Sequence, residues 1–309
     1  MPQAMTMMHE NIALVQRIRE LSRPLHPAPT GVRPRVRPIL EIKAVLFDVY
    51  GTLLISGAGD IGTDTGDIKA REFREALEAV GLHLGKGKPA ALGMVQLGKA
   101  IRRARRRRRE DGIAFPEINI ELVWRDIVTS LWRAHRVDGR LGRGRIRRLA
   151  IEYECRVNPV WPMPGLSDVL PRLKAAGLIL GIVSNAQFFT PLVLAAFPET
   201  GWTSGLFDKT LCAWSYSWKE AKPSSRMLKA ILYRLSRYHG ITPGETLVVG
   251  NDMRNDILPA SRLGCHTVLF AGDARSLRWR SEKPECRAVT PSLILTRMAQ
   301  LPAAMNNSM

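Results

Sequence analysis

Polar and charged side chains follow the ends of several short apolar runs in this 309-residue sequence. In chain order they are Asp48, Tyr50, Thr52, Ser184, Asn185, Asp252, Asn255 and Asp256. Lys222 stands directly before Pro223, at the expected start of a helix. Ligand sites in open parallel sheets lie beyond the carboxyl ends of the strands. If the apolar runs are neighbouring strands, we expect these side chains to converge on one site.

The three carboxylates of such a site would need a counter-charge. Two unit charges about 4 Å apart repel by about 4 kcal/mol at an effective dielectric constant of about 20. The ammonium of Lys222 does not offset three carboxylates, so either one acid has a raised pKa or a divalent cation lies among them. Oxygen ligands without a nearby His or Cys favour Mg²⁺ over Zn²⁺. The residue types therefore predict a Mg²⁺ site.

Four short apolar runs predict the strands that would position these residues. They are 42–47, 178–183, 246–249 and 266–270. Each run is apolar on both faces, which is typical of a parallel sheet covered by helices on each side. Helical patterns separate the later runs, and this alternation predicts a Rossmann-like, doubly wound α/β core. We assign the core to residues 41–56 and 160–309.

The interval between the first two runs has a different pattern. It lacks a strong strand run and shows helical periodicity at 67–80 and 120–134. Residues 84–150 hold 18 Lys and Arg against 6 Asp and Glu, a net +12 out of +18 for the whole chain. We predict a separate helical subdomain with an Arg-rich segment, inserted over residues 57–159.

Four motifs in order carry a family resemblance. Residues 47–53, Phe-Asp-Val-Tyr-Gly-Thr-Leu, resemble the first motif of the haloacid dehalogenase (HAD) superfamily. Ser184-Asn185 resembles the second motif, Lys222-Pro223 the third, and residues 250–256, Gly-Asn-Asp-Met-Arg-Asn-Asp, the acidic fourth. The resemblance covers about 42–275, and the insertion is similar to the helical cap of many members.

The resemblance implies a hydrolase in which Asp48 is the nucleophile. An aspartyl intermediate would divide one difficult step into two easier ones. Thr52 and Ser184 would hydrogen-bond the transferring group, with Asn185 nearby in the substrate site.

The resemblance also implies how charge is handled. Lys222 would neutralise charge on the nucleophile and the intermediate. Asp252 would bind Mg²⁺ together with Asp48 and the backbone carbonyl of Tyr50. Asp256 would orient Lys222 or bind the metal through water.

Tyr50 departs from the phosphatase form of the first motif, in which a second Asp serves as general acid. A phenol with a pKa of about 10 is a poor proton donor near neutrality. The Asp-x-Tyr-Gly-Thr form resembles the 2-haloacid dehalogenases, which work without metal and whose halide needs no proton. Tyr50 is equally consistent with a packing residue whose backbone alone matters.

The back half of the sequence opposes the dehalogenase interpretation. Dehalogenases show Ser-x-Asn-x-x-Asp, whereas alignment on Asp256 places Asn251 and Met253 at the first two positions. They also carry a Tyr six residues after the motif lysine, where this chain has Leu228. Because the fourth motif decides whether metal binds, we predict a Mg²⁺-dependent phosphohydrolase acting on a small phosphorylated substrate. A metal-independent 2-haloacid dehalogenase and a catalytically weakened basic binding protein are the alternatives.

A run of seven arginines and one alanine, Arg102–Arg109, is the most basic segment. Such runs are commonly solvated faces, although they also attract anionic substrates or nucleic acid. No aromatic residue interleaves the run and no nucleic-acid fold motif accompanies it. We expect a small anionic substrate as the main partner, with nucleic acid binding at Arg102–Arg109 as the less favoured alternative.

The remaining features indicate a cytoplasmic protein. Residues 1–40 are basic and Pro-rich, with weak helical periodicity at 9–22, and we predict a flexible tail. The four cysteines form no C-x-x-C pair, which argues against a disulfide framework. No apolar run approaches the roughly 20 residues of a membrane span, so we expect no membrane partner.

Overall fold

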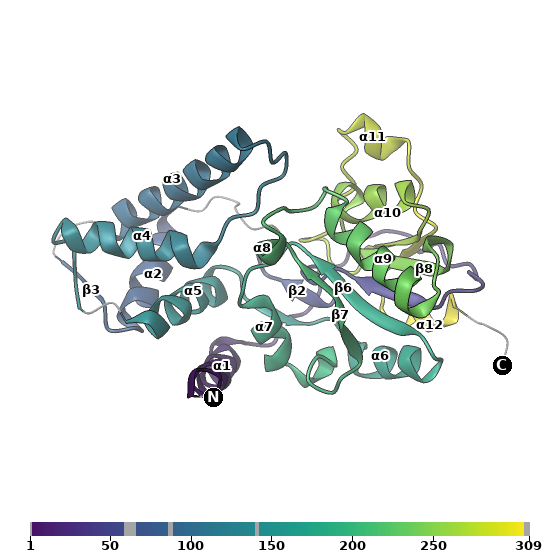
Figure 1. Ribbon diagram of the computed structural model, residues 1–309, viewed down its shortest axis with the longest axis horizontal. Helices are drawn as coiled ribbons and strands as arrows, with labels where there is room; N and C mark the ends of the chain where they lie inside the picture. The colour runs from purple at the N-terminus through teal and green to yellow at the C-terminus, as the bar shows by residue number, and fades with distance from the viewer. Residues whose placement is uncertain (1, 59–65, 86–88, 140–141, 306–309) are drawn as a thin grey trace.

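A computed structural model describes residues 2–58, 66–85, 89–139 and 142–305 of the chain. A six-stranded sheet forms the centre of the core, in the order β10-β9-β8-β1-β6-β7, with every neighbouring pair parallel (Figure 1). The strands are β1 (Ala44–Phe47), β6 (Ile179–Ser184), β7 (Phe207–Trp214), β8 (Thr246–Gly250), β9 (His266–Phe270) and β10 (Leu293–Leu295). β1 lies between the strands that carry the second and fourth motifs. The predicted doubly wound α/β fold and its four strands are confirmed.

Two strands of the sheet, β7 and β10, were not predicted. β7 lies at the edge of the sheet, and its buried positions are interrupted by the exposed Lys209 and Thr210. β10 has three residues, Leu293–Leu295. Neither segment therefore presents the continuous apolar run by which central parallel strands are recognised.

Helices cover both faces of the sheet because alternate residues of a strand point to opposite sides. Val45 and Phe47 of β1 belong to a buried cluster with α1, α6 and α7, whereas Ala44 and Leu46 belong to a second cluster with α9 and α10. The helices of the core are α6 (Leu166–Ala175), α7 (Thr190–Ala196), α8 (Ser215–Trp218), α9 (Arg226–His239), α10 (Leu258–Arg262), α11 (Pro284–Arg287) and α12 (Gln300–Ala303). α9 ends at Gly240, whose φ of 65° is the left-handed conformation that glycine adopts readily.

Four helices form a separate layer beyond the sheet (Figure 1). They are α2 (Gly66–Glu78), α3 (Pro89–Glu110), α4 (Ile120–Arg133) and α5 (Arg143–Val157). Two-stranded ribbons accompany them, made by β2 (Leu54–Ser56) with β5 (Val160–Pro162) and by β3 (His83–Leu84) with β4 (Val137–Asp138). The layer has its own buried cluster, in which Phe73 stacks on Trp124. The exact limits of the cap stay a prediction, and residues 59–65, 86–88 and 140–141 lie outside the described chain.

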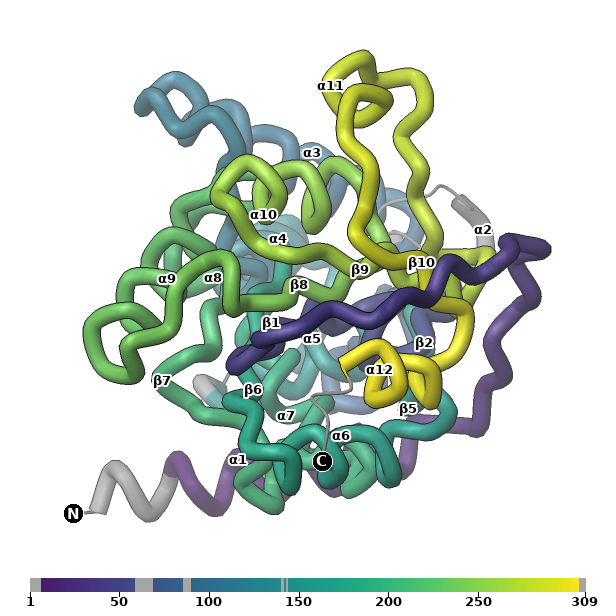
Figure 2. Tube along the Cα trace, turned by 90° about the vertical axis from the view of Figure 1, so that its right-hand side faces the viewer, coloured from purple at the N-terminus to yellow at the C-terminus, as the bar shows by residue number. Residues whose placement is uncertain are grey.

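The N-terminal segment differs from the predicted flexible tail. Helix α1 (Pro2–Leu21) buries Leu14 and Ile18 against the core, and Arg17 pairs with Glu152 of α5 at 2.7 Å. The following segment runs along the C-terminal part of the core, where Arg35 bridges Ile294 (Figure 2). Two apolar residues four positions apart give weak periodicity, so this helix depends on tertiary packing. Within the described residues, no helix is both long and apolar enough to cross a membrane.

Candidate active site

The carboxyl ends of β1, β6 and β8 open into a cavity of about 110 Å³. The predicted site residues that line it are Asp48, Tyr50, Asn185, Lys222, Asp252, Asn255 and Asp256. The backbone N–H of Asp48 donates to the carbonyl of Val249 at 2.9 Å, which fixes the end of β1 beside β8. Two predicted residues, Thr52 and Ser184, are fully buried behind the cavity wall. The expected convergence of the strand ends is therefore present.

Lys222 joins two carboxylates at the floor of the cavity. Its Nζ donates to Oδ1 of Asp48 at 2.6 Å and to Oδ1 of Asp256 at 2.5 Å, and also to the carbonyl of Val183 at 3.1 Å. Burial lowers the pKa of this ammonium, but the two carboxylates outweigh burial and raise the pKa above its usual value. Lys222 therefore stays charged, as a counter-ion of the predicted nucleophile must.

For Asp256, burial and the neighbouring carboxylates outweigh the effect of Lys222 on the pKa. Burial raises its pKa, Lys222 lowers it, and the neighbouring Asp48 and Asp252 raise it again, to about 7. Its Oδ2 accepts the backbone N–H of Asp252 at 3.0 Å. Burial and the neighbouring carboxylates therefore oppose the ionisation of Asp256, whereas Lys222 favours it.

Two residues of the second motif hold this pair in place. The hydroxyl of Ser184 donates to Oδ1 of Asp48 at 3.2 Å. The amide oxygen of Asn185 accepts the backbone N–H of Lys222 at 2.7 Å, and its amide nitrogen donates to the carbonyl of Lys222 at 3.4 Å. Asn185 therefore fixes the segment that carries Lys222, a role that its type as a turn-forming residue does not reveal.

The phenol of Tyr50 is hydrogen-bonded at the start of helix α7, and Tyr50 also lines the cavity. Its hydroxyl shares a hydrogen bond of 2.9 Å with Thr190. Burial, helped by nearby Glu154, raises the pKa of this phenol far above its usual value. Such a hydroxyl is a weaker proton donor than an ordinary tyrosine, and much weaker than the aspartic acid of the phosphatase motif.

Thr52 connects the first motif to the fourth. Its hydroxyl donates to the amide oxygen of Asn251 at 3.3 Å, and the amide nitrogen of Asn251 donates to the carbonyl of Ser276 at 2.5 Å. Gly51 has a φ of 85°, and a Cβ there would lie within 2.6 Å of Asn251 and Ser276. Glycine is therefore required for this close approach.

The carboxylate of Asp252 is already fully engaged. Oδ1 accepts the backbone N–H groups of Arg254 at 2.8 Å and Asn255 at 3.2 Å, which caps the following helical turn. Oδ2 accepts the side-chain amide of Asn255 at 3.0 Å and two nitrogens of Arg280, at 2.6 and 3.1 Å. Sequence reasoning did not identify Arg280, because it lies 28 positions further along the chain.

The predicted Mg²⁺ does not fit the side chains as they are arranged. Asp252, the assigned ligand, accepts six hydrogen bonds. Three of them come from two nitrogens of Arg280, because Nε also reaches Oδ1, at 3.3 Å. Within the described part of the chain, no three Asp, Glu, His or Cys side chains are grouped so that they could hold a metal ion. Mg²⁺ is usually bound through one or two carboxylates together with waters and substrate phosphate. Here donors occupy both oxygens of Asp252, and Oδ1 of Asp48 accepts from Lys222.

Further residues that line the cavity were also not predicted. They are Ser56, Asn251, Ser276 and Arg278. The hydroxyl of Ser276 is buried and, in the described part of the structure, has no hydrogen-bond partner. The sequence indicated two of these residues in part, because Ser276 and Arg278 lie in the segment after β9, and site residues of parallel sheets follow the strand ends. Leu228 and Met253, by contrast, lie in apolar clusters.

A loop between α3 and α4 joins the helical layer to the site. The carbonyl of Phe115 accepts the backbone N–H of Ala221 at 2.7 Å, next to Lys222. The buried carboxylate of Glu117 accepts hydrogen bonds from Ser215 at 2.6 Å and from Gln187 at 3.0 Å. The helical layer thus contacts both the lysine segment and the loop after the second motif.

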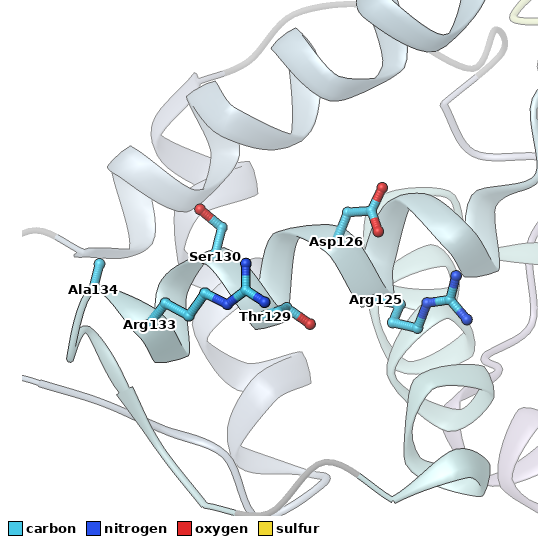
Figure 3. A pocket seen from close by; sticks show the side chains of 6 residues that line it. All are labelled: Arg125, Asp126, Thr129, Ser130, Arg133 and Ala134. Carbon is cyan, nitrogen blue, oxygen red and sulfur yellow. The ribbon is translucent and has the colours of Figure 1, made fainter.

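A larger hollow, of about 650 Å³, lies on the outer side of α4 (Figure 3). Its lining residues are Arg125, Asp126, Thr129, Ser130, Arg133 and Ala134. All six belong to one helix and its end, so among the described residues no second element contributes to the lining of this hollow. The strand-end cavity is therefore the better candidate for chemistry, despite its smaller volume.

Comparisons with known proteins agree with this geometry. A family model described as haloacid dehalogenase-like hydrolase matches residues 42–264. No curated protein matches the chain. A 2-haloacid dehalogenase from Pseudomonas syringae pv. Tomato DC3000 superimposes with a TM-score of 0.54 and 15% identity, over 85% of this chain and 97% of the other. A HAD phosphatase from Thermococcus onnurineus gives 0.50 and 17%, over 85% and 97%. At these identities the likeness shows the fold alone.

Proposed function

Because the chain belongs to the family of haloacid dehalogenase-like hydrolases, we propose that it hydrolyses a small anionic substrate through a covalent ester of Asp48. The leaving group departs without receiving a proton. The halide of a 2-haloacid has this property, so hydrolytic dehalogenation is the activity that the geometry supports best. This reverses the order in which the sequence alone ranked phosphate esters and haloacids.

Asp48 has the surroundings of a nucleophile. Lys222 and Ser184 both donate to its Oδ1, which leaves Oδ2 as the attacking atom. Attack on the substrate carbon forms a carbon–oxygen bond, and the halide leaves with the electrons of the broken carbon–halogen bond. Water then adds to the ester carbonyl of Asp48, and the acyl–oxygen bond breaks. One proton of the water goes to the departing alkoxide, which gives the hydroxy acid, and the other is released to solvent, which restores the carboxylate of Asp48. Lys222 stabilises the negative charge that develops on the carboxyl oxygens during both steps.

The observation that carries the proposal is the position of the Tyr50 phenol. It is engaged with Thr190 and its pKa is raised, so the residue two positions after the nucleophile supplies no proton. Loss of a general acid typically costs about 10²–10⁴-fold when the leaving group needs a proton. A halide does not need one, and the reaction keeps its rate.

The Mg²⁺-dependent phosphohydrolase is the second candidate, because Asp252 and Asp256 line the cavity together with Asp48. If Asp252 were released from its present partners, two acids of the fourth motif would face the nucleophile. The contacts of Asp252 described above oppose this arrangement, and they make the phosphohydrolase the weaker proposal.

Two activity assays, each run with and without EDTA, separate the candidates. Halide release from 2-chloropropionate that persists in EDTA supports the proposal, and hydrolysis of p-nitrophenyl phosphate that stops in EDTA supports the phosphohydrolase. Asp48→Asn should abolish either activity. A folded chain with neither activity would contradict both and favour a basic binding protein on a hydrolase scaffold.

A further inference from the structure

The fourth motif of this chain is paired with a positively charged side chain, Arg280. Asp252 lies two residues after the end of β8 and is 6% exposed at the edge of the cavity. Arg280 reaches its Oδ2 with two nitrogens, at 2.6 and 3.1 Å, while the guanidinium side chain stays 28% exposed. An arginine fork on a carboxylate is among the stronger charge-assisted pairs.

The backbone around Arg280 is arranged for this contact. Arg278 pairs with the motif loop through two backbone hydrogen bonds, from its N–H to the carbonyl of Asn251 and from the N–H of Met253 to its carbonyl, both 2.9 Å. Two residues later, Arg280 has a φ of 53°, the left-handed region that non-glycine residues rarely adopt. Such backbone strain persists where surrounding contacts determine the conformation, and it is concentrated at functional sites.

The carboxylates of the cavity also require the positive charge of Arg280 as a counter-ion. Asp48, Asp252 and Asp256 bring three carboxylates, and Lys222 pairs with two of them. Arg280 pairs with the third. A guanidinium cannot be deprotonated in a protein, so its charge is available at every working pH. A divalent cation at Asp252 would have to displace this fixed charge.

We propose that Arg280 is a built-in counter-ion that takes the place of a divalent metal at the fourth motif, by occupying the oxygens of Asp252 that the metal would require. The inference rests on the proposed function, because it supplies the reason why the reaction at Asp48 proceeds without metal. It concerns the binding of a cation, however, and is tested without turnover.

The test is Mn²⁺ binding to the full chain, measured by electron paramagnetic resonance of the free ion and by calorimetry. We expect no saturable binding to the wild type at the cavity. Arg280→Gln should gain a saturable Mn²⁺ site, with an affinity at least about 10-fold above the weakest binding that the measurement detects, since groups around metal ligands change affinity by about 10- to 100-fold. The added site should disappear in the double variant with Asp252→Asn.

Arg254→Gln is the matched control. Arg254 lies in the same loop and contributes its backbone N–H to Asp252, but its side chain pairs with Glu285 at 3.9 Å. The control removes the same charge and should gain no Mn²⁺ site. If Arg280→Gln does not fold, Arg280→Met removes the charge and keeps an apolar stem of similar reach, and it should gain the same Mn²⁺ site.

Two results would overturn the proposal. One is wild-type Mn²⁺ binding that Asp252→Asn removes, and the other is a folded Arg280 variant that gains no site. Halide release is measured on the same samples. A wild type that neither binds Mn²⁺ nor releases halide contradicts the proposed function while leaving the role of Arg280 supported.

Discussion

Lys222→Met offers a quantitative test of how the charges at the strand ends are balanced. The ammonium makes contacts of 2.6 and 2.5 Å with two carboxylates, and the side chains of Lys222, Asp48 and Asp256 are 6%, 10% and 3% exposed. Methionine keeps most of the volume and removes the charge. The change leaves two buried carboxylates facing each other without a counter-ion.

The expected cost follows from the burial of the pair. Removing one partner of a buried ion pair typically costs about 3–5 kcal/mol, and here one cation serves two acids, so we expect the upper half of that range at pH 8. The folded-state pKa of Asp256 already lies at about 7, above its ordinary 3.8, and loss of Lys222 raises it further. An acid with a raised pKa stabilises the fold at low pH and loses that contribution as the pH rises through the raised value. The cost should therefore shrink by about 1–3 kcal/mol at pH 5, since each pH unit is worth 1.36 kcal/mol per proton.

Urea denaturation at pH 5 and pH 8 measures both the loss of unfolding free energy and its change with pH. Lys229→Met is the matched control, because Lys229 is exposed on α9, and it should change stability by no more than about 0.5 kcal/mol. The double variant Lys222→Met with Asp256→Asn should recover part of the loss at pH 8. A loss below about 1 kcal/mol, or one that does not depend on pH, would refute the charge balance derived from these burials.

Three further predictions test other parts of the structure. Tyr50→Phe should keep the rate of halide release within about threefold, since the phenol is engaged with Thr190; a drop by the factor of about 10² that marks a lost acid would restore Tyr50 as a proton donor. Burial raises the pKa of Glu154 from 4.5 to about 7, which at 1.36 kcal/mol per unit costs at most about 3 kcal/mol when the group is ionised. Glu154→Gln should therefore raise the free energy of unfolding at pH 8 more than at pH 5, and an equal change at both would contradict the burial effect. If duplex DNA binds at Arg102–Arg109, changing three exposed residues of α3 to Gln should lower the salt slope of that binding by up to about 3 and leave halide release unchanged. These residues are Arg103, Arg106 and Arg107, and an unchanged slope would show that another surface attracts the anion.

The parts of the site that the sequence predicts are those determined by topology. Asp48 and Asp256 follow buried strands, and parallel strands bring their carboxyl ends to one edge of the sheet. Lys222 was recognisable from its place before Pro223 in an ordered set of motifs. The structure places Lys222 within 2.6 Å of both acids.

The parts that the sequence does not predict depend on pairs with no local signal. Arg280 pairs with Asp252 although 28 positions separate them in the sequence, and its backbone is in the left-handed conformation. No hydrophobic periodicity predicts such a contact. The phenol of Tyr50 meets Thr190 across 140 positions. Both contacts decide the chemistry, because one affects metal binding and the other affects proton donation. The residue types alone left each of these questions open.

The central claim is that Asp48 forms a covalent ester with the substrate. A single turnover in heavy-oxygen water, with enzyme in excess over 2-chloropropionate, tests it directly. Water attack on the ester carbonyl should place one heavy oxygen atom in the peptide that contains Asp48, and little in the first product released. Label that enters the hydroxy acid at once, with none in Asp48, would mean that water attacks the substrate directly and would contradict the account.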